Sequence, residues 1–300
     1  MAVLAKGSLF PVELEKTLFN KVKGHSSLVK MSASEAVPFC GKDIFTFSFT
    51  NHLAVVGENG DKPVGDASIV AKTIKPIKVV YQERVSDEFV YAAEEKQIEY
   101  LQAFTDGFAK ELGRGLDIMA LHGFNPNTNT ASTNVIGNNH FDYEIQSGNT
   151  IAYVAANADS NIDDAVAKVE GAEYEVNGCI IAPVVRSDLA KLTTSGKGRA
   201  YPEFAFGGCP DKLGAMTLDS NATVSVNGGD NRVYVGDFKN CFRWGIAKEI
   251  PLKVIEYGNP DGQGDLQAKN QVVLRAEAYI GWAIMDNAAF AKVAVDSDDT

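Results

Sequence analysis

The sequence predicts a protein of the α+β class, and three observations support this prediction. Phe45, Phe47 and Phe49 alternate with polar residues, which is the period of a strand with one apolar face. Residues 95–122 repeat apolar side chains at spacings of three and four, which indicates a long amphipathic helix. Alternating runs return after residue 217, so several further strands are expected to share a sheet late in the chain.

Composition limits the classes of protein to consider. Three hundred residues with 45% hydrophobic content can bury a large core, in one elaborate domain or two ordinary ones. The net charge of -11 argues against a broad nucleic-acid-binding surface, because such a surface needs clustered Lys and Arg. No signal-peptide core or membrane-length segment is present, so we expect a protein made and kept in the cytoplasm. Cys40, Cys179, Cys209 and Cys241 form no CxxC pair and are predicted to be buried free thiols.

A long β-hairpin is predicted in the first third of the chain. The run Phe45–Val55 would span about 36 Å at about 3.3 Å per residue. The polar segment VGENGDKP, Val56–Pro63, turns the chain, and residues 69–85 resume the alternation. Because an isolated two-stranded ribbon is only marginally stable in water, this hairpin needs another surface, and a second copy of the protein is the obvious candidate.

Helices are predicted on both sides of the hairpin. Leu14, Leu18 and Val22 indicate a short amphipathic helix, and Ser86 is placed to cap a helix after the hairpin. The long helix runs from Glu95 to His122, about 40 Å at 1.5 Å per residue. It contains three glycines, at positions 107, 113 and 115, each costing roughly 1 kcal/mol relative to alanine unless close packing or a bend offsets the loss.

The remainder alternates between helices and strands. Residues 124 to about 160 are predicted to be irregular, and a helix capped by Asn161 or Ser160 follows. Cys179–Val185 is predicted to be a buried strand, and Ser187 to open another helix. Strands are also predicted on both sides of the Asn-Gly-Gly-Asp turn, at 244–257 and at 270–285, before an acidic tail at 296–300.

Residues typical of active sites do not converge in this sequence. His25, His52, His122 and His140 are dispersed without metal-ligand spacing. The glycine-rich stretch from Gly196 lacks the complete phosphate-binding patterns. Asp163 and Asp164 are adjacent on a helix and therefore point in different directions. We predict no catalytic residue, no cofactor-binding residue and no metal ligand, and hence a protein that is not an enzyme.

The order of these segments resembles the major capsid protein of tailed bacteriophages, the Hong Kong 97-type capsid fold family. The resemblance covers nearly the whole chain: LFPVEL near the start, Val56 to Glu58 with Lys62 and Pro63, then Val85, Ser86 and Glu88 before the long helix, IIAPVVRSDLAKL, GDF and a strand-rich end. It implies an N-terminal arm at 1–35, an E-loop β-hairpin at 36–85 and a P-domain spine helix at 86–123. It also implies an A-domain at 124–235, followed by P-domain return strands and a C-terminal tail at 236–300.

The resemblance also implies a function. The chain would be a structural major head protein that self-assembles into pentamers and hexamers of an icosahedral shell. This shell would enclose double-stranded DNA without sequence-specific binding. Because the arm pattern starts directly after Met1, the expected scaffolding protein is a separate chain, and portal and decoration proteins are further expected partners. The expected location is the virion, after assembly in the host bacterial cytoplasm.

Some members of the family join subunits through an isopeptide bond between Lys and Asn. Lys62 and Lys72 lie in the expected E-loop, and Asn270 and Asn287 lie in the C-terminal region. All four are interpreted as ordinary surface residues, so no crosslinking role is transferred to them.

Two alternatives remain open from the sequence. An encapsulin-like nanocompartment subunit would share the fold but enclose cargo enzymes instead of DNA. A compact ligand-binding or catalytic α+β protein is the second alternative, although a long charged hairpin would be unusual in it.

Overall fold

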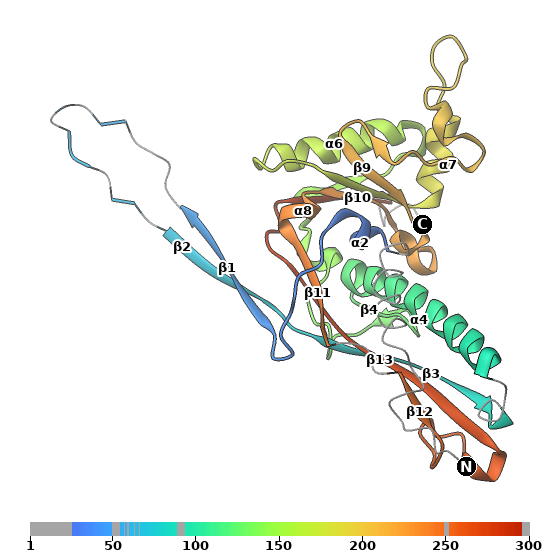
Figure 1. Ribbon diagram of the computed structural model, residues 1–300. Coiled ribbons are helices and arrows are strands. Elements are labelled where there is room, and N and C mark those ends of the chain that lie inside the picture. Colours follow the sequence, from blue (N-terminus) through green and yellow to red (C-terminus); the bar gives the residue numbers. More distant parts are fainter. Residues whose placement is uncertain are drawn as a thin grey trace.

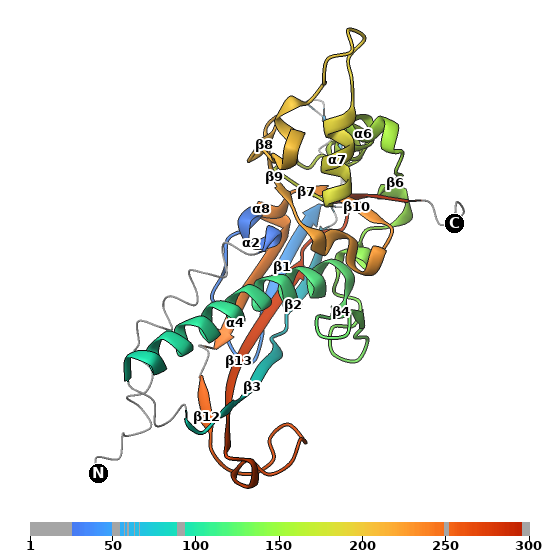
Figure 2. The same ribbon diagram turned by 90° about the vertical axis from the view of Figure 1, so that its right-hand side faces the viewer.

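The computed structural model describes residues 26–49, 55–56, 58, 60–62, 64–65, 67–88, 94–248 and 252–295. Figures 1 and 2 show an upper lobe and a lower sheet beside a long helix, and Figure 1 shows a two-stranded ribbon that projects from the body. The predicted helix near Leu14, three positions of the predicted turn (57, 59 and 63) and the acidic tail lie outside the described residues.

The lower sheet is organised around one long strand, β13 (Gln271–Ile284). β3 (Ile77–Ser86) pairs antiparallel with β13 from Gln271 to Ile280, and β12 (Lys253–Ile255) pairs with it as well. β11 (Phe242–Lys248) pairs with the last part of β13. The strands predicted at 244–257 and 270–285 are therefore confirmed, with a break between β11 and β12.

The projecting ribbon consists of β1 (Lys42–Phe49) and β2 (Ala67–Ile74), paired antiparallel from Lys42↔Ile74 to Phe49↔Ala67. The prediction that 69–85 forms one hairpin strand is wrong, because the run divides at Lys75 and Pro76. Pro76 has no backbone N–H to give to a ladder. After it, β3 leaves the ribbon and joins the lower sheet.

The long helix is confirmed as α4 (Glu94–His122), and it ends at Gly123 in a left-handed conformation with φ +69°. Its glycines are not equivalent. A Cβ on Gly115 would approach Pro126 Cγ at 3.3 Å, so close packing explains that position. A Cβ on Gly107 would meet nothing within 4 Å.

The upper lobe contains a six-stranded sheet, in the order β6, β14, β10, β7, β9, β8. The strand expected from Cys179 is confirmed as β7 (Gly178–Ile181), but α7 (Pro183–Lys191) begins four residues before Ser187. Pro183 occupies the first turn, where its fixed φ suits a helix and its missing N–H costs nothing. The other strands of this sheet are β6 (Thr150–Ala152), β8 (Lys212–Leu213), β9 (Met216–Ser220), β10 (Asn231–Gly236) and β14 (Phe290–Ala294).

Two further expectations for the upper lobe were wrong. α6 (Ala158–Glu170) begins before Asn161, whose side chain is buried in the helix and accepts a hydrogen bond from the Val154 N–H at 2.8 Å. The first strand expected before the Asn-Gly-Gly-Asp turn is instead a short 3₁₀ segment, η4 (Ala222–Gly228). The Asn221 side chain accepts from the Thr223 N–H and so starts a helical turn there.

The short elements complete the description. They are α2 (Ser27–Met31), β4 (Phe124–Asn125), β5 (Thr130–Ala131), α5 (Phe141–Glu144), η1 (Ser147–Asn149), η2 (Ala155–Asn157), η3 (Pro202–Gly207), α8 (Phe238–Cys241) and η5 (Gln267–Lys269). Within the described ranges, no helix is long and apolar enough to cross a membrane.

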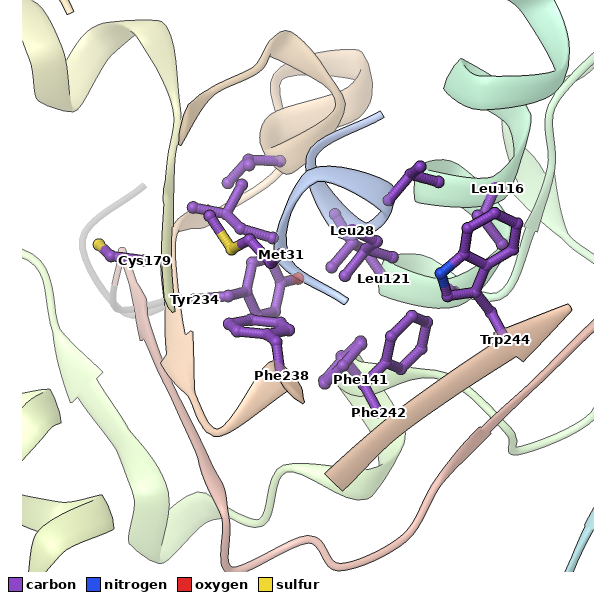
Figure 3. Close-up of a cluster of buried hydrophobic side chains, with 14 of the residues drawn as sticks. Leu28, Met31, Leu116, Leu121, Phe141, Cys179, Tyr234, Phe238, Phe242 and Trp244 are labelled. Carbon is purple, nitrogen blue, oxygen red and sulfur yellow. The ribbon is translucent and has the colours of Figure 1, made fainter. Parts of the chain in front are cut away.

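One continuous core joins the upper lobe to the lower sheet. Figure 3 shows that it gathers side chains from α2, α4, α5, β10 and β11. Phe141 is fully buried, with Phe290 and Phe242 at ring-centroid distances of 4.8 and 5.5 Å. Cys179 and Cys241 are buried as predicted, whereas Cys40 and Cys209 are exposed.

Two glycine substitutions test this packing in opposite directions. A Cβ on Gly245 in β11 would lie 2.1 Å from the Glu35 carbonyl oxygen, so Gly245→Ala must displace the segment that crosses this strand. We expect it to lower the free energy of unfolding by about 1–3 kcal/mol. Gly107→Ala adds a methyl group to open space on α4 and should raise the free energy of unfolding by up to about 1 kcal/mol.

Urea unfolding followed by circular dichroism measures both changes. Equal stabilities for Gly245→Ala and the wild type would show that the chain crosses β11 less closely than described.

Candidate assembly surfaces

One face of the ribbon carries a row of large apolar side chains. Cross-strand pairing places Phe45 opposite Ala71 and Phe47 opposite Ile69, so these side chains share one face. Phe45, Phe47 and Ile69 are 69%, 56% and 65% exposed. Such a row of exposed apolar side chains on a projecting element marks an interaction surface, because a lone subunit gains nothing by exposing it.

The base of the ribbon is fixed to the body. Ile74 is fully buried and packs with Val37 and Ala283 in a small separate apolar cluster. Lys72 forms an ion pair with Glu144 of α5 at 3.3 Å. The ribbon therefore leaves the body in a defined direction, and its apolar face is presented in a fixed place.

The four residues considered for crosslinking are not brought together. Lys72 contacts Glu144, and Lys62 is exposed. Asn270 has φ +50° and accepts a backbone hydrogen bond from Asp87, whereas the Asn287 carbonyl accepts from Phe290. Within one subunit, the described contacts give no Lys–Asn pair.

A buried carboxylate anchors the start of the described chain. Asp117 lies on α4, is fully buried, and accepts hydrogen bonds from the Ser26 hydroxyl and from the Ser27 N–H at 3.0 Å. Asn221 Nδ2 and Thr223 Oγ1 donate to the same carboxylate at 3.0 and 3.3 Å. The short helix α2 is thereby attached to α4 and to the η4 segment.

A second buried network joins α4, α5 and the upper sheet. Asp142 accepts from Tyr234 Oη at 2.6 Å and from Asn231 Nδ2 at 2.9 Å, and it lies 2.7 Å from His122 Nδ1. His122 Nε2 lies 2.8 Å from the Thr223 carbonyl oxygen. Both ring nitrogens thus face oxygen acceptors, so His122 is a structural link between elements.

The two carboxylates respond to burial differently. Burial raises the pKa of Asp117 to about 6, despite the hydrogen bonds that favour its charged form. Burial also opposes ionisation of Asp142, but His122, Lys292 and Tyr234 outweigh it and hold the pKa of that carboxyl below its ordinary value.

The loop at the lower tip is held by Arg84 of β3. Its guanidinium donates to the Asp261 carboxylate at 2.6 Å, to the Gly264 carbonyl at 2.8 Å and to the Gln271 side chain at 3.0 Å. Hydrogen bonding from Arg84 holds the pKa of Asp261 below its ordinary value. This end of the molecule is therefore also presented in a fixed shape.

No catalytic arrangement emerges among the described residues. His122 is buried in the structural network, and His25 and His52 lie outside the described ranges. Asp163 and Asp164 are both exposed on α6. In the part of the chain that the structure describes, no three His, Cys, Asp or Glu side chains are grouped to hold a metal ion.

Sequence reasoning missed Asp117, Asp142 and Arg84 as organising residues. Each of the three has partners that are distant in the chain. Only Asp117 could have been predicted to be buried, because it lies among apolar residues of the long helix.

Comparison with known proteins identifies the class of protein that this fold defines. The family model described as "Phage capsid family" matches residues 7–295, so the chain belongs to the phage capsid family. No curated protein matches the chain.

Solved structures agree with this assignment. A protein of Mycobacterium phage Ogopogo is similar with a TM-score of 0.78 and 30% identity, over 91% of this chain and 92% of that chain. A protein of Gordonia phage Cozz has a TM-score of 0.75 and 22% identity, over 91% and 87%. The capsid of a native GTA particle has a TM-score of 0.65 and 14% identity, over 90% of each chain.

These findings confirm the expected Hong Kong 97-type capsid fold and show a structural protein of the phage capsid. They favour a phage capsid protein over an encapsulin-like subunit.

The opposite pKa shifts predict opposite pH profiles. The folded state binds a proton at Asp117 between its ordinary pKa of 3.8 and its raised pKa of about 6, so this group adds stability as the pH falls through that window. Asp117→Asn removes this contribution and also replaces one of the carboxylate oxygens that accept hydrogen bonds. The free energy of unfolding of the wild type should therefore exceed that of the variant by about 1–3 kcal/mol at pH 7. This difference in stability should grow as the pH falls towards 4.

Asp142→Asn is the matched comparison. Because the folded pKa of Asp142 lies below 3.8, its contribution is present above that pH and declines as the pH falls further. Urea unfolding across pH 3–7 measures the stability of the wild type and of both variants. If the stabilities of the wild type and Asp117→Asn changed in parallel with pH, the raised pKa of Asp117 would be contradicted.

Proposed function

We propose that this capsid protein is the major head subunit, forming the pentamers and hexamers of an icosahedral shell around double-stranded DNA. Residues 1–35 are assigned as the N-terminal arm, 36–85 as the E-loop, and 86–123 as the spine-helix part of the P-domain. Residues 124–235 are assigned to the A-domain and 236–300 to the return strands and tail, with β14 contributing to the six-stranded sheet.

The observation that carries this proposal is the apolar face of the ribbon. Phe45 and Ile69 are exposed, although Ile74 at the base of the same ribbon is buried in the body. A second copy offers the partner surface, and repetition by symmetry makes many modest contacts sum to a closed assembly.

Anchoring of the arm supports the same proposal. The Asp117 hydrogen bonds fix the chain at Ser26 and Ser27, so the proposed arm starts from a defined origin. The arm and the ribbon then contact different neighbours.

Net charge supports the proposed cargo. DNA carries one negative charge per about 1.7 Å of duplex, so a shell of subunits with net charge -11 does not bind it tightly as it enters. We infer a purely structural role without catalysis. The proposed partners are a separate scaffolding protein, a portal protein and a decoration protein, and assembly takes place in the bacterial cytoplasm.

Negative-stain electron microscopy of the purified chain tests the proposal. Closed shells, or rings of five and six subunits, are the expected result, with or without the candidate scaffolding protein. A uniform monomer near 32 kDa under both conditions would overturn it.

Substitution on the ribbon separates folding from assembly. Phe45→Asp combined with Ile69→Asp places charge on the apolar face, so we expect folded subunits and a yield of closed particles reduced at least about tenfold. Ser68→Asp, an exposed position on the opposite face, is the matched control and should assemble normally.

Deletion of residues 57–65 should likewise leave folded subunits that do not close shells. Particles of normal yield from either ribbon variant would remove the ribbon from the proposed assembly mechanism.

A further inference from the structure

The upper lobe contains an acidic pocket that is also lined by apolar side chains. Its volume is about 360 Å³, and Ile162, Leu189 and Met216 are among its apolar lining residues. Asp159, Asp163 and Glu170 of α6 line it, and none of its lining residues is Lys or Arg. An engineered cavity of about 150 Å³ accommodates benzene, so this pocket has room for an aromatic ring together with a cationic group.

The carboxylates of this pocket are available for a partner. Asp159 accepts from Tyr201 Oη at 3.2 Å, whereas Asp163 and Glu170 form no ion pair with any residue in the described part of the chain. Two carboxylates without an ion-pair partner, beside apolar lining residues, favour a ligand that is cationic at one end and apolar at the other.

The same lobe carries a cluster with the complementary chemistry. Phe206 is 99% exposed, whereas Phe204, two residues earlier, is buried. The Arg199 guanidinium lies 5.0 Å from the centroid of the Phe206 ring, and Lys197 is exposed nearby in the chain. We call Lys197, Arg199 and Phe206 the tip cluster.

The tip cluster is held in a fixed conformation. Backbone hydrogen bonds from Thr194 to Gly198 at 2.8 Å and from Ala200 to Leu192 at 2.8 Å close a small hairpin between α7 and η3. Phe206 has φ +55°, a left-handed conformation that is unfavourable for a bulky residue. A constrained backbone thus keeps an aromatic ring in water, which favours a binding role over a packing role.

The tip cluster does not fill the pocket of its own subunit. None of its three residues lines that pocket. The segment between α7 and η3 projects beyond the helices of the lobe in both views (Figures 1 and 2). When a subunit carries a pocket and a complementary projection at different places, the projection of one copy can bind the pocket of the next copy. Such a head-to-tail contact closes a ring when the rotation between successive copies is suitable.

We propose that the tip cluster of one subunit docks in the acidic pocket of the next subunit around the pentamer and hexamer rings. The Phe206 ring contacts the apolar lining residues of the pocket, and Arg199 and Lys197 pair with Asp163 and Glu170. This inference rests on the proposed ring-forming function and adds the contact that connects successive subunits.

Disulfide trapping tests the contact directly. Phe206→Cys and Asp163→Cys are made on separate chains in which the exposed Cys40 and Cys209 are replaced by Ser. The two chains are mixed before assembly and oxidised, and covalent dimers are expected only in the mixture. Trapping requires Cα atoms within about 7 Å, so it reports the proposed geometry.

Charge reversal tests the energetics. Lys197→Glu with Arg199→Glu is expected to reduce the yield of rings and shells by about tenfold, and Asp163→Lys with Glu170→Lys on the same chain should restore most of it. Lys168→Glu is the matched control, because Lys168 is exposed on α6 and does not line the pocket. Phe206→Ala removes the aromatic side chain without changing the charge, and it should also reduce the yield of subunit rings and shells.

The outcomes distinguish this inference from the proposed function. Wild-type yields from both the charge-reversed chain and Phe206→Ala, without disulfide trapping, would overturn the docking contact and leave the shell function intact. Absence of rings and shells from the wild-type chain itself, with its scaffolding protein present, would overturn both. Mixture-specific dimers with rescue by the second charge reversal are the expected result.

Discussion

The pairing of β13 on both of its edges is the constraint on which the rest of the structure depends. β3 lies along one edge of β13, and β11 and β12 lie along the other. Through β3 this strand sets the origin of the ribbon, and through β11 it reaches the core around Phe141. The ribbon, which we propose as an assembly surface, is therefore positioned by a ladder of backbone hydrogen bonds, which depends little on the identity of exposed side chains.

The sequence predicted elements whose signal is local and periodic. α4 and β13 were located almost to the residue, because each carries a long apolar repeat of its own period. The errors occurred where a single residue overrides a pattern: Pro76 ends the ribbon strand, Pro183 starts α7 early, and the Asn221 side chain replaces a strand with a 3₁₀ turn. The resemblance to capsid proteins supplied the topology, which periodicity alone does not determine.

The organising polar residues were harder to predict for a different reason. Asp117 meets Ser26 and Thr223 only after the chain has folded across about a hundred residues on each side, so no short motif announces it. The acidic pocket is similarly hard to predict, because α6 supplies its carboxylates and β9 supplies part of its apolar lining. Surfaces for assembly are defined by what remains uncovered after folding, and a pattern along the chain does not report that.

The continuation of β2 into β3 has a mechanical consequence. In Figure 1, β2 runs on into β3 in nearly the same direction. Tension applied to the ribbon by a neighbour is therefore transmitted along the axis of β3 and acts on its ten paired residues with β13 in shear. Hydrogen bonds loaded in shear share the force, whereas bonds that are peeled open break one after another, so the pairing of β3 with β13 resists a pull along the ribbon better than it would resist peeling.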